Sequence, residues 1–296
     1  MFKIKCVILA IICCLMFFCI SFSSCKTKSK DEVVEQEESS EEQGNEKECD
    51  KPLNLSLFLD LSDRIIRDNV NPSQMFNDTA IANYFVDYFI QSCVKQGIIN
   101  SRNNFQILFY PTPNEPDIVS LSKSMCVDMA KLTPAEKKAY LMEMKSKIEK
   151  NLDVIYSKTL KEQKWVGCDI WGFFSNKQVD KLCIRKGFRN VIVILTDGYL
   201  YHVDNKIKEG SSYSYILPQT LNAGGDLLIK RNDLKDLEVI VLEVNPYDLK
   251  QREPLVSTLQ EWFENMGLSS DDISINVTDV ENHIEPIIDS FMNRTK

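Results

Sequence analysis

The eight residues from Val191 to Gly198, VIVILTDG, carry the clearest signal of fold class in the chain. The first five are continuously apolar, which is typical of a strand in a sheet covered by helices on both faces. Thr196, Asp197 and Gly198 follow as a polar turn where that strand ends. The segment therefore predicts a central strand of an α/β sheet with polar residues at its carboxyl end.

Apolar runs and amphipathic stretches alternate over the rest of the chain. Four more runs are predicted to be strands: 53–61, 104–110, 237–244 and 273–277. The predicted helices begin at the caps Asp78-Thr79 and Thr133, at Pro254 and near Ile284. Strands that alternate with helices predict a mostly parallel central sheet with helices on both faces. Ligands bind such sheets beyond the carboxyl ends of the strands.

The N-terminus has the order of regions found in a signal peptide, which we place at residues 1–24. Lys3 and Lys5 precede an uncharged apolar run over residues 7–22, shorter than the ~20 residues of a spanning helix. Ser21-Phe22-Ser23-Ser24-Cys25 resembles the lipobox of bacterial lipoproteins, although Phe22 replaces the commoner Leu. The resemblance implies cleavage before Cys25 and a covalent lipid, such as palmitate, on its thiol. A permanent transmembrane anchor is the alternative.

Residues 25–51 are predicted to be a disordered acidic tether, because they hold no aromatic residue and their acids repel one another. Lys30-Asp31-Glu32 loosely resembles the acidic run that marks export to the cell surface in some double-membraned bacteria. We therefore expect a cell-envelope protein, at the outer membrane or cell surface, held to the membrane by the lipid. Residues 52–296 then form one α/β domain, since that length suits a single large core.

The net charge and the spacing of the cysteines argue against two classes of ligand, nucleic acid and structural zinc. The formal net charge is -8 and no basic stripe recurs at helix or strand spacing, which argues against nucleic acid as a partner. Five cysteines follow Cys25, at positions 49, 93, 126, 168 and 183. Without a C-x-x-C pair, and with only two histidines, a structural zinc site is not expected. Buried thiols with at most one or two disulfides are expected instead.

Three polar segments meet the predicted end of the sheet. They are Asp60-Leu61-Ser62-Asp63-Arg64, Gly167-Cys168-Asp169-Ile170 and Thr196-Asp197-Gly198. Their placement resembles the von Willebrand factor A domain, whose metal-ion-dependent adhesion site uses D-x-S-x-S, a later Thr and the Asp of T-D-G. The resemblance implies that Asp60, Ser62 and Asp197 hold Mg²⁺, Mn²⁺ or Ca²⁺. One coordination position is then left for an acidic group of a partner.

The chain departs from that pattern at two positions. Arg64 stands in place of the second Ser, and Cys168 stands at the Thr position with Asp169 beside it. Turned inward, Arg64 would pair with Asp60 or Asp197 and take the electrostatic role of the metal. Turned outward, it would leave four ligands: Asp60, Ser62, Asp169 and Asp197. Each carboxylate also has a structural interpretation, as a turn residue or, for Asp169, as a helix cap.

Residues 199–233 are longer than a usual strand-to-helix loop, and we predict an insertion beside the site. The segment carries four tyrosines, at positions 199, 201, 213 and 215, together with Gly224-Gly225. Partly exposed tyrosines suit protein or glycan recognition, and local packing that buries them is the alternative.

The motifs of common catalytic sites are missing from the sequence. It has no G-x-S-x-G elbow, no phosphate-binding loop and no G-x-G-x-x-G after a strand, and His202 and His283 are isolated. We therefore expect a binding domain rather than an enzyme, one that recognises a protein, peptide or surface polymer with or without a bridging metal. The alternatives are an assembly scaffold with a vestigial site and a metal-dependent hydrolase.

Overall fold

The apolar runs become strands of one sheet in the computed structural model. It describes residues 51–66, 73–162, 168–199, 207–209, 212–214, 229, 231–246, 249–277 and 284–294. The predicted signal peptide, Cys25, all of the tether except Lys51, Cys49, both histidines and most of the predicted insertion lie outside these residues.

The central sheet has six strands in the described part of the chain. They are β1 Leu53–Leu59, β2 Asn104–Leu108, β3 Val127–Asp128, β4 Arg189–Leu195, β7 Leu237–Leu242 and β8 Ile273–Ile275. Their order is β3-β2-β1-β4-β7-β8, and every neighbouring pair is parallel except β2 and β3. This arrangement confirms the predicted fold class of a mostly parallel α/β sheet. The order reverses between β1 and β4, which is the topological switch point of such a sheet.

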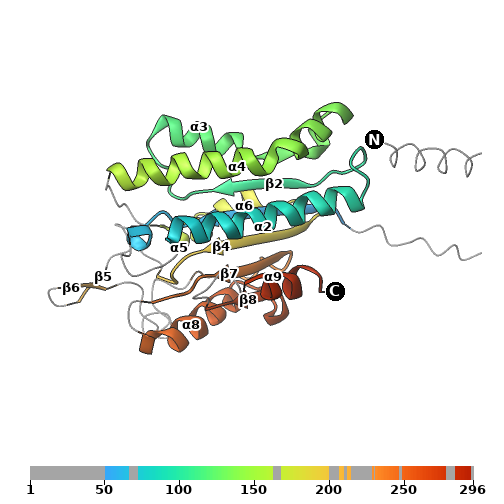
Figure 1. Cartoon of the computed structure of the whole chain (residues 1–296). Coiled ribbons are helices and arrows are strands. Elements are labelled where there is room, and N and C mark those ends of the chain that lie inside the picture. The colour runs from blue at the N-terminus through green and yellow to red at the C-terminus, as the bar shows by residue number, and fades with distance from the viewer. Residues whose placement is uncertain are drawn as a thin grey trace, which may run out of the picture. The chain divides into compact units, whose positions relative to one another are not determined.

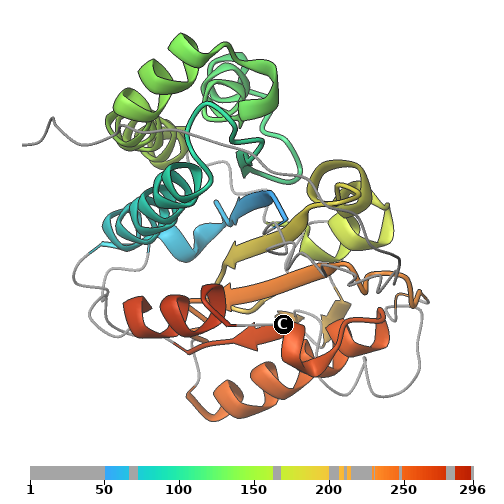
Figure 2. The same cartoon turned by 90° about the vertical axis from the view of Figure 1, so that its right-hand side faces the viewer.

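Helices cover both faces of the sheet (Figures 1 and 2). The α-helices are α2 Gln74–Lys95, α3 Pro116–Ser124, α4 Pro134–Glu162, α5 Ile170–Ser175, α6 Gln178–Cys183, α8 Arg252–Asn265 and α9 Ile284–Met292. Short 3-10 turns are η2 Asp63–Ile66, η3 Met129–Lys131, η5 Leu249–Gln251 and η6 Ser270–Asp272.

The core divides into two parts because successive strand residues point to opposite faces. Leu57 and Val193 pack with α2, α4 and α9, whereas Phe58 and Ile194 pack with α5, α6 and α8. Phe58 makes an edge contact with Phe173 of α5, with ring centroids 4.9 Å apart. Both faces are therefore covered, which explains why β4 is continuously apolar from Val191 to Leu195.

The start of α4 confirms the predicted capping box. The backbone amide of Thr133 donates to a carboxylate oxygen of Glu136 at 2.8 Å, and the Glu136 amide donates back to the Thr133 hydroxyl at 3.4 Å. The start of α2 differs from the prediction, because the helix begins at Gln74, after Ser73, and Asp78 lies buried inside it. The predicted cap at Asp78-Thr79 is therefore wrong: the Asp78 carboxylate binds a buried arginine instead.

Ion pairs connect elements at the amino end of the sheet. Arg189, at the start of β4, donates to both carboxylate oxygens of Glu238 in β7, at 2.8 to 3.2 Å. Arg294 donates to the same carboxylate at 2.8 Å, and Arg189 also donates to the carbonyl of Met292 at 2.6 Å. The end of α9 is thus fastened to two central strands.

Other predictions concern cysteines and the insertion. Among the described cysteines, Cys93, Cys168 and Cys183 are buried free thiols and Cys126 is an exposed one. Within residues 199–233, β5 Ile207–Glu209 and β6 Ser212–Ser214 pair with each other as an antiparallel hairpin. No helix in the described ranges is long and apolar enough to cross a membrane.

Candidate functional site

The carboxyl ends of β1, β4 and β7 are level with one another. Leu59 is in register with Leu195, and Leu195 with Leu242. The backbone amides that follow continue this pattern, since Asp60 N donates to Leu195 O at 3.1 Å and Thr196 N to Leu242 O at 3.3 Å. The next residue of each strand therefore falls in one row across the switch point: Asp60, Thr196 and Glu243.

Asp60 joins the loops after β1 and β4. Its carboxylate is completely buried, with one oxygen accepting from the Ser62 amide at 2.8 Å and the other from the Thr196 hydroxyl at 2.9 Å. Burial raises the pKa of Asp60, while Arg64 and the hydrogen bonds from Ser62 and Thr196 act in the opposite direction. Both carboxylate oxygens are thus engaged in holding the strand ends together.

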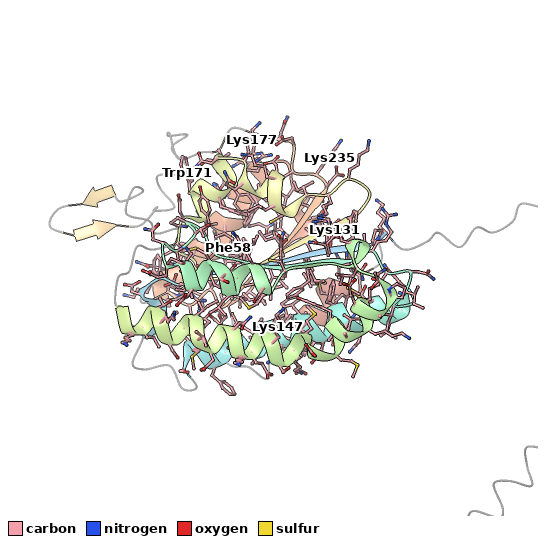
Figure 3. All side chains as sticks on the ribbon, turned by 90° about the horizontal axis from the view of Figure 1, so that it is seen from above. Phe58, Lys131, Lys147, Trp171, Lys177 and Lys235 are labelled. Atoms are coloured by element: carbon pink, nitrogen blue, oxygen red, sulfur yellow. The ribbon has the colours of Figure 1, made fainter. Side chains whose placement is uncertain are left out.

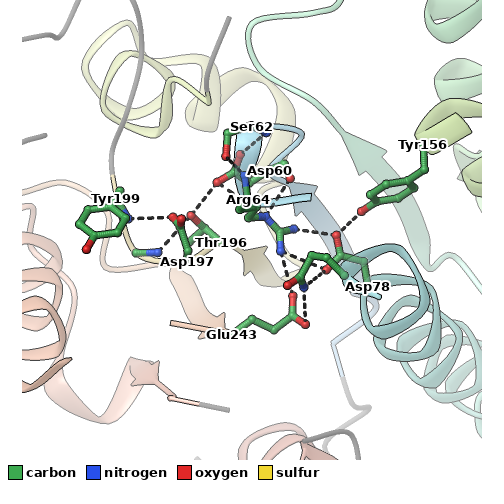
Figure 4. Close-up of polar contacts among 11 residues, drawn as sticks. Asp60, Ser62, Arg64, Asp78, Tyr156, Thr196, Asp197, Tyr199 and Glu243 are labelled. Atoms are coloured by element: carbon green, nitrogen blue, oxygen red, sulfur yellow. Dashed lines mark hydrogen bonds and ion pairs between the residues drawn. The ribbon is translucent and has the colours of Figure 1, made fainter. Parts of the chain in front are cut away.

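Arg64 turns inward from η2 and is 1% exposed. Figure 4 shows its guanidinium between β1, α2 and the end of β7. Nε donates to the carbonyl of Asp60 at 2.9 Å, and Nη2 and Nη1 donate to the two carboxylate oxygens of Asp78 at 2.6 and 3.2 Å. Nη1 also reaches Oε2 of Glu243 at 3.2 Å. Burial alone would lower the pKa of Arg64, but the carboxylates of Asp78, Glu243 and Asp60 raise it well above its usual value.

Two more side chains complete this buried network. The Gln74 amide donates to Asp78 at 2.9 Å and to Glu243 at 2.8 Å, and the Tyr156 hydroxyl donates to Asp78. Burial and the Asp78 charge raise the pKa of Tyr156, so its hydroxyl keeps its proton. Glu243 has a φ of 66°, a left-handed conformation that non-glycine residues adopt only when their surroundings impose it. We name Arg64, Gln74, Asp78, Tyr156 and Glu243 the arginine cluster.

The other predicted site residues build the neighbouring loops. Asp169 caps α5, because its carboxylate accepts from the Gly172 amide at 2.7 Å. Asp197 accepts from the Tyr199 amide at 3.1 Å, and the Gly198 amide donates to the Thr196 hydroxyl at 3.3 Å. Cys168 is buried, and burial followed by the Asp60 charge raises its thiol pKa well above the usual value.

The predicted metal ligands do not fit a Mg²⁺ site. Asp60 has both oxygens hydrogen-bonded, and the Arg64 guanidinium lies 3.8 Å from one of them. A divalent cation bound to Asp60 would lie near this guanidinium and be repelled by its charge. Over the residues that the structure describes, no three His, Cys, Asp or Glu side chains are grouped so that they could hold a metal ion.

Known proteins give only distant matches. No protein-family model matches the chain, and no curated protein is significantly similar to it. Among solved structures, an aerotolerance-related membrane protein from Bacteroides fragilis, carrying multiple mutations to serine, is 13% identical, with 82% of this chain and 100% of that one covered and a TM-score of 0.37. The conserved hypothetical protein BatB from Bacteroides thetaiotaomicron is 11% identical over 82% of this chain and 100% of that one, with a TM-score of 0.35.

The pilus adhesin SpaC from Lactobacillus rhamnosus GG is 11% identical, with a TM-score of 0.39. The overlap covers 82% of this chain but only 30% of the adhesin. At these scores the overlaps add nothing to the sheet order and side-chain contacts described above.

Four members of the arginine cluster were missed in the sequence: Gln74, Asp78, Tyr156 and Glu243. Asp78 lies on the apolar stripe of its helix, in line with Ala82 and Phe85, and an acid in that position signals a buried charge. Glu243 was placed inside a strand predicted to run to residue 244, whereas β7 ends at Leu242. Aligning the ends of the three central strands would have placed Glu243 beside Asp60 and Thr196.

Half-buried aromatic side chains surround this end of the sheet. Tyr110 follows β2, Tyr199 follows β4, and Trp171 lies in the first turn of α5. The Tyr110 ring lies 5.5 Å from that of Phe173, and the Tyr199 hydroxyl contacts Gln251. In Figure 3, Trp171 and Lys131 lie toward opposite ends of the domain. Tyr110, Trp171 and Tyr199 form what we call the aromatic rim.

Proposed function

We propose that this chain is an exported, lipid-anchored envelope protein whose domain, of the von Willebrand factor A type, binds a protein, peptide or surface polymer. The binding face is the carboxyl end of the sheet around β1 and β4. The observation that supports this most is the level row of Asp60, Thr196 and Glu243 at the switch point, where open α/β sheets bind ligands.

Buried hydrogen bonds at this end of the sheet support recognition. Asp60, Arg64 and Thr196 hold the described starts of the loops after β1 and β4, residues 60–66 and 196–199, in a fixed arrangement. Preorganised loops lose little conformational entropy when they bind. The aromatic rim supplies large side chains that are half exposed, of the kind enriched at protein interfaces.

Partner capture from envelope extract tests the proposal. The full chain carrying both Trp171→Ala and Tyr199→Ala should lose a partner that the wild type captures, while it still unfolds cooperatively. Phe188→Ala is the matched control, because Phe188 is also a half-buried aromatic residue but precedes β4 at the opposite end of the sheet. Equal loss of capture in the control and the double variant would refute the strand-end face as the binding surface.

An assembly scaffold is the second candidate. It is favoured by the local roles of Asp169 and Asp197, which cap a helix and close a turn. Under this alternative, Asp60→Ala would lower stability, and the double rim variant would capture the same proteins as the wild type. Under the binding proposal, capture depends on the aromatic rim.

A further inference from the structure

The guanidinium of Arg64 is bound by oxygen atoms that come from separate parts of the fold. Carboxylates of Asp60, at the end of β1, Asp78, in α2, and Glu243, after β7, lie within 3.8 Å of guanidinium nitrogens. The carbonyl of Asp60 adds a fourth oxygen. The same guanidinium therefore ties the ends of β1 and β7 to helix α2.

The guanidinium of Arg64 can neutralise carboxylates at this position as a divalent cation does in a metal site, but the physical interaction is different. Each neutralises converging carboxylates and fixes their positions, but the guanidinium does so through directed hydrogen bonds and cannot dissociate or lose its proton in a protein. The two parallel bonds to Asp78, together with the single bonds to Glu243 and to the Asp60 carbonyl, use four of the five N–H donors of Arg64.

We propose that Arg64 is a permanent internal cation that replaces a divalent metal at the strand-end site, and that this face works without metal. The proposal stands on the contacts of Arg64 and does not depend on which partner the domain binds. It assigns Arg64 as a positioning residue, since it acts through the carboxylates that shape the loops. With Arg64 in place, the carboxylates of Asp60, Asp78 and Glu243 are not grouped as metal ligands. Removing the guanidinium leaves them without a countercharge, and a divalent cation could then enter by drawing them together.

Titration of the wild-type chain with MgCl₂, MnCl₂ and CaCl₂ in a calorimeter is the first test. We expect no saturable heat, and the same melting temperature in excess cation and in EDTA. Stoichiometric binding of any of the three cations at this site, or a lower melting temperature in EDTA, would overturn the proposal. Partner capture should also persist in EDTA. Partner capture that requires a divalent cation would contradict the metal-free role of Arg64, but it would not contradict the proposed strand-end binding function.

Variants at position 64 provide the second test, with a readout that a purely structural arginine would not change. Arg64→Ala should melt at a lower temperature than the wild type and bind a divalent cation at least about tenfold more tightly, with its stability restored by that cation. Arg64→Lys is the matched control, because it keeps a positive charge in the same space and should gain no such affinity.

Failure of Arg64→Ala to fold would not remove the test. Refolding yield would then be compared with and without each cation, with recovery expected only when the cation is present. A folded Arg64→Ala chain that binds no cation, or an unfolded one that no cation rescues, would show that the three carboxylates do not form a cation site. Equal gains in Arg64→Ala and Arg64→Lys would also contradict the proposal.

Discussion

Arg64 brings together residues that lie far apart in the chain. Asp78 is 14 residues away and Glu243 is 179 residues away, yet both accept hydrogen bonds from the same guanidinium. Each carboxylate is buried, so removing the arginine alone would leave uncompensated charge inside the domain, which typically costs about 3–5 kcal/mol. The arginine cluster is therefore the group of side chains whose substitution should affect stability most steeply.

Glu243 should make the stability of the domain depend on pH. Burial, followed by the nearby Asp78 charge, raises its pKa well above the ordinary 4.5. A raised pKa in the folded state stabilises at low pH, and this contribution is lost as the pH rises through the raised value. Glu243→Gln cannot ionise, so its unfolding free energy should fall less between about pH 5 and pH 8 than that of the wild type.

Urea unfolding at both pH values measures this difference. Glu264→Gln is the control, since Glu264 is exposed and hydrogen bonds from Gln260 and Ser270 lower its pKa rather than raise it. Asp60 also has a raised pKa, so some pH dependence of the same sign should remain in Glu243→Gln. An unchanged slope in that variant would show that Glu243 does not titrate in the folded domain.

The sequence predicts the positions of some site residues but not of others. Asp60, Ser62, Thr196 and Asp197 follow apolar strands directly, and so their position at the sheet end could be predicted. Tyr156 lies on α4, and its contact with Asp78 exists only after α4 packs against α2. Gln74 lies one turn before Asp78 in the same helix, but its contact with Glu243, 169 residues away, also forms only in the folded domain. No local pattern encodes such a contact, because propensity and periodicity describe neighbours along the chain rather than across it.

At the scale of elements, Asp169 can act at the start of α5 either as a helix cap or through its negative charge. Its carboxylate accepts from the Gly172 amide, and a Cβ on Gly172 would fall 2.0 Å from a carboxylate oxygen, so a glycine is needed for the cap to close. Asparagine caps helices about as well as aspartate.

Asp169→Asn should therefore be nearly neutral, whereas Asp169→Ala should lower the unfolding free energy by about 1 kcal/mol. Thermal and urea unfolding of the two variants check this order. A large loss of stability with asparagine would mean that the negative charge matters, and that Asp169 does more than cap the helix.

Elements with long apolar signals were predicted and short ones were missed. The five predicted strands all form. β1, β2, β7 and β8 each end two residues earlier than predicted, and β4 begins two residues earlier. The two-residue strand β3 and the helices α3 and α6 were not predicted. Elements this short do not contain enough residues to show a periodic pattern of apolar residues. Their positions depend on packing: β3 pairs with β2, α3 packs on α4 and β2, and α6 packs on β1 and β4.

For the molecule as a whole, the proposed anchor rests on Cys25. This cysteine ends an apolar run too short to span a bilayer and precedes an acidic stretch without aromatic residues. Cys25→Ala should leave an unprocessed precursor of higher mass, detected by gel mobility and mass spectrometry of the membrane fraction. Cys49→Ala is the control and should be processed and fractionate as the wild type does. A Cys25→Ala chain that is still cleaved and still sediments with membranes would contradict the lipoprotein assignment.

The position of β1 has a mechanical consequence for such an anchored protein. The chain enters the sheet at Leu53, and β1 lies between β2 and β4, parallel to both. A ligand held at the far end of β1 and a tether pulled at its near end would stretch the domain along this strand. Tension would then load the hydrogen bonds to both neighbours in shear, all at once, instead of peeling them apart one after another. The domain is thus connected so that a pulling force acts along a strand that is paired on both sides.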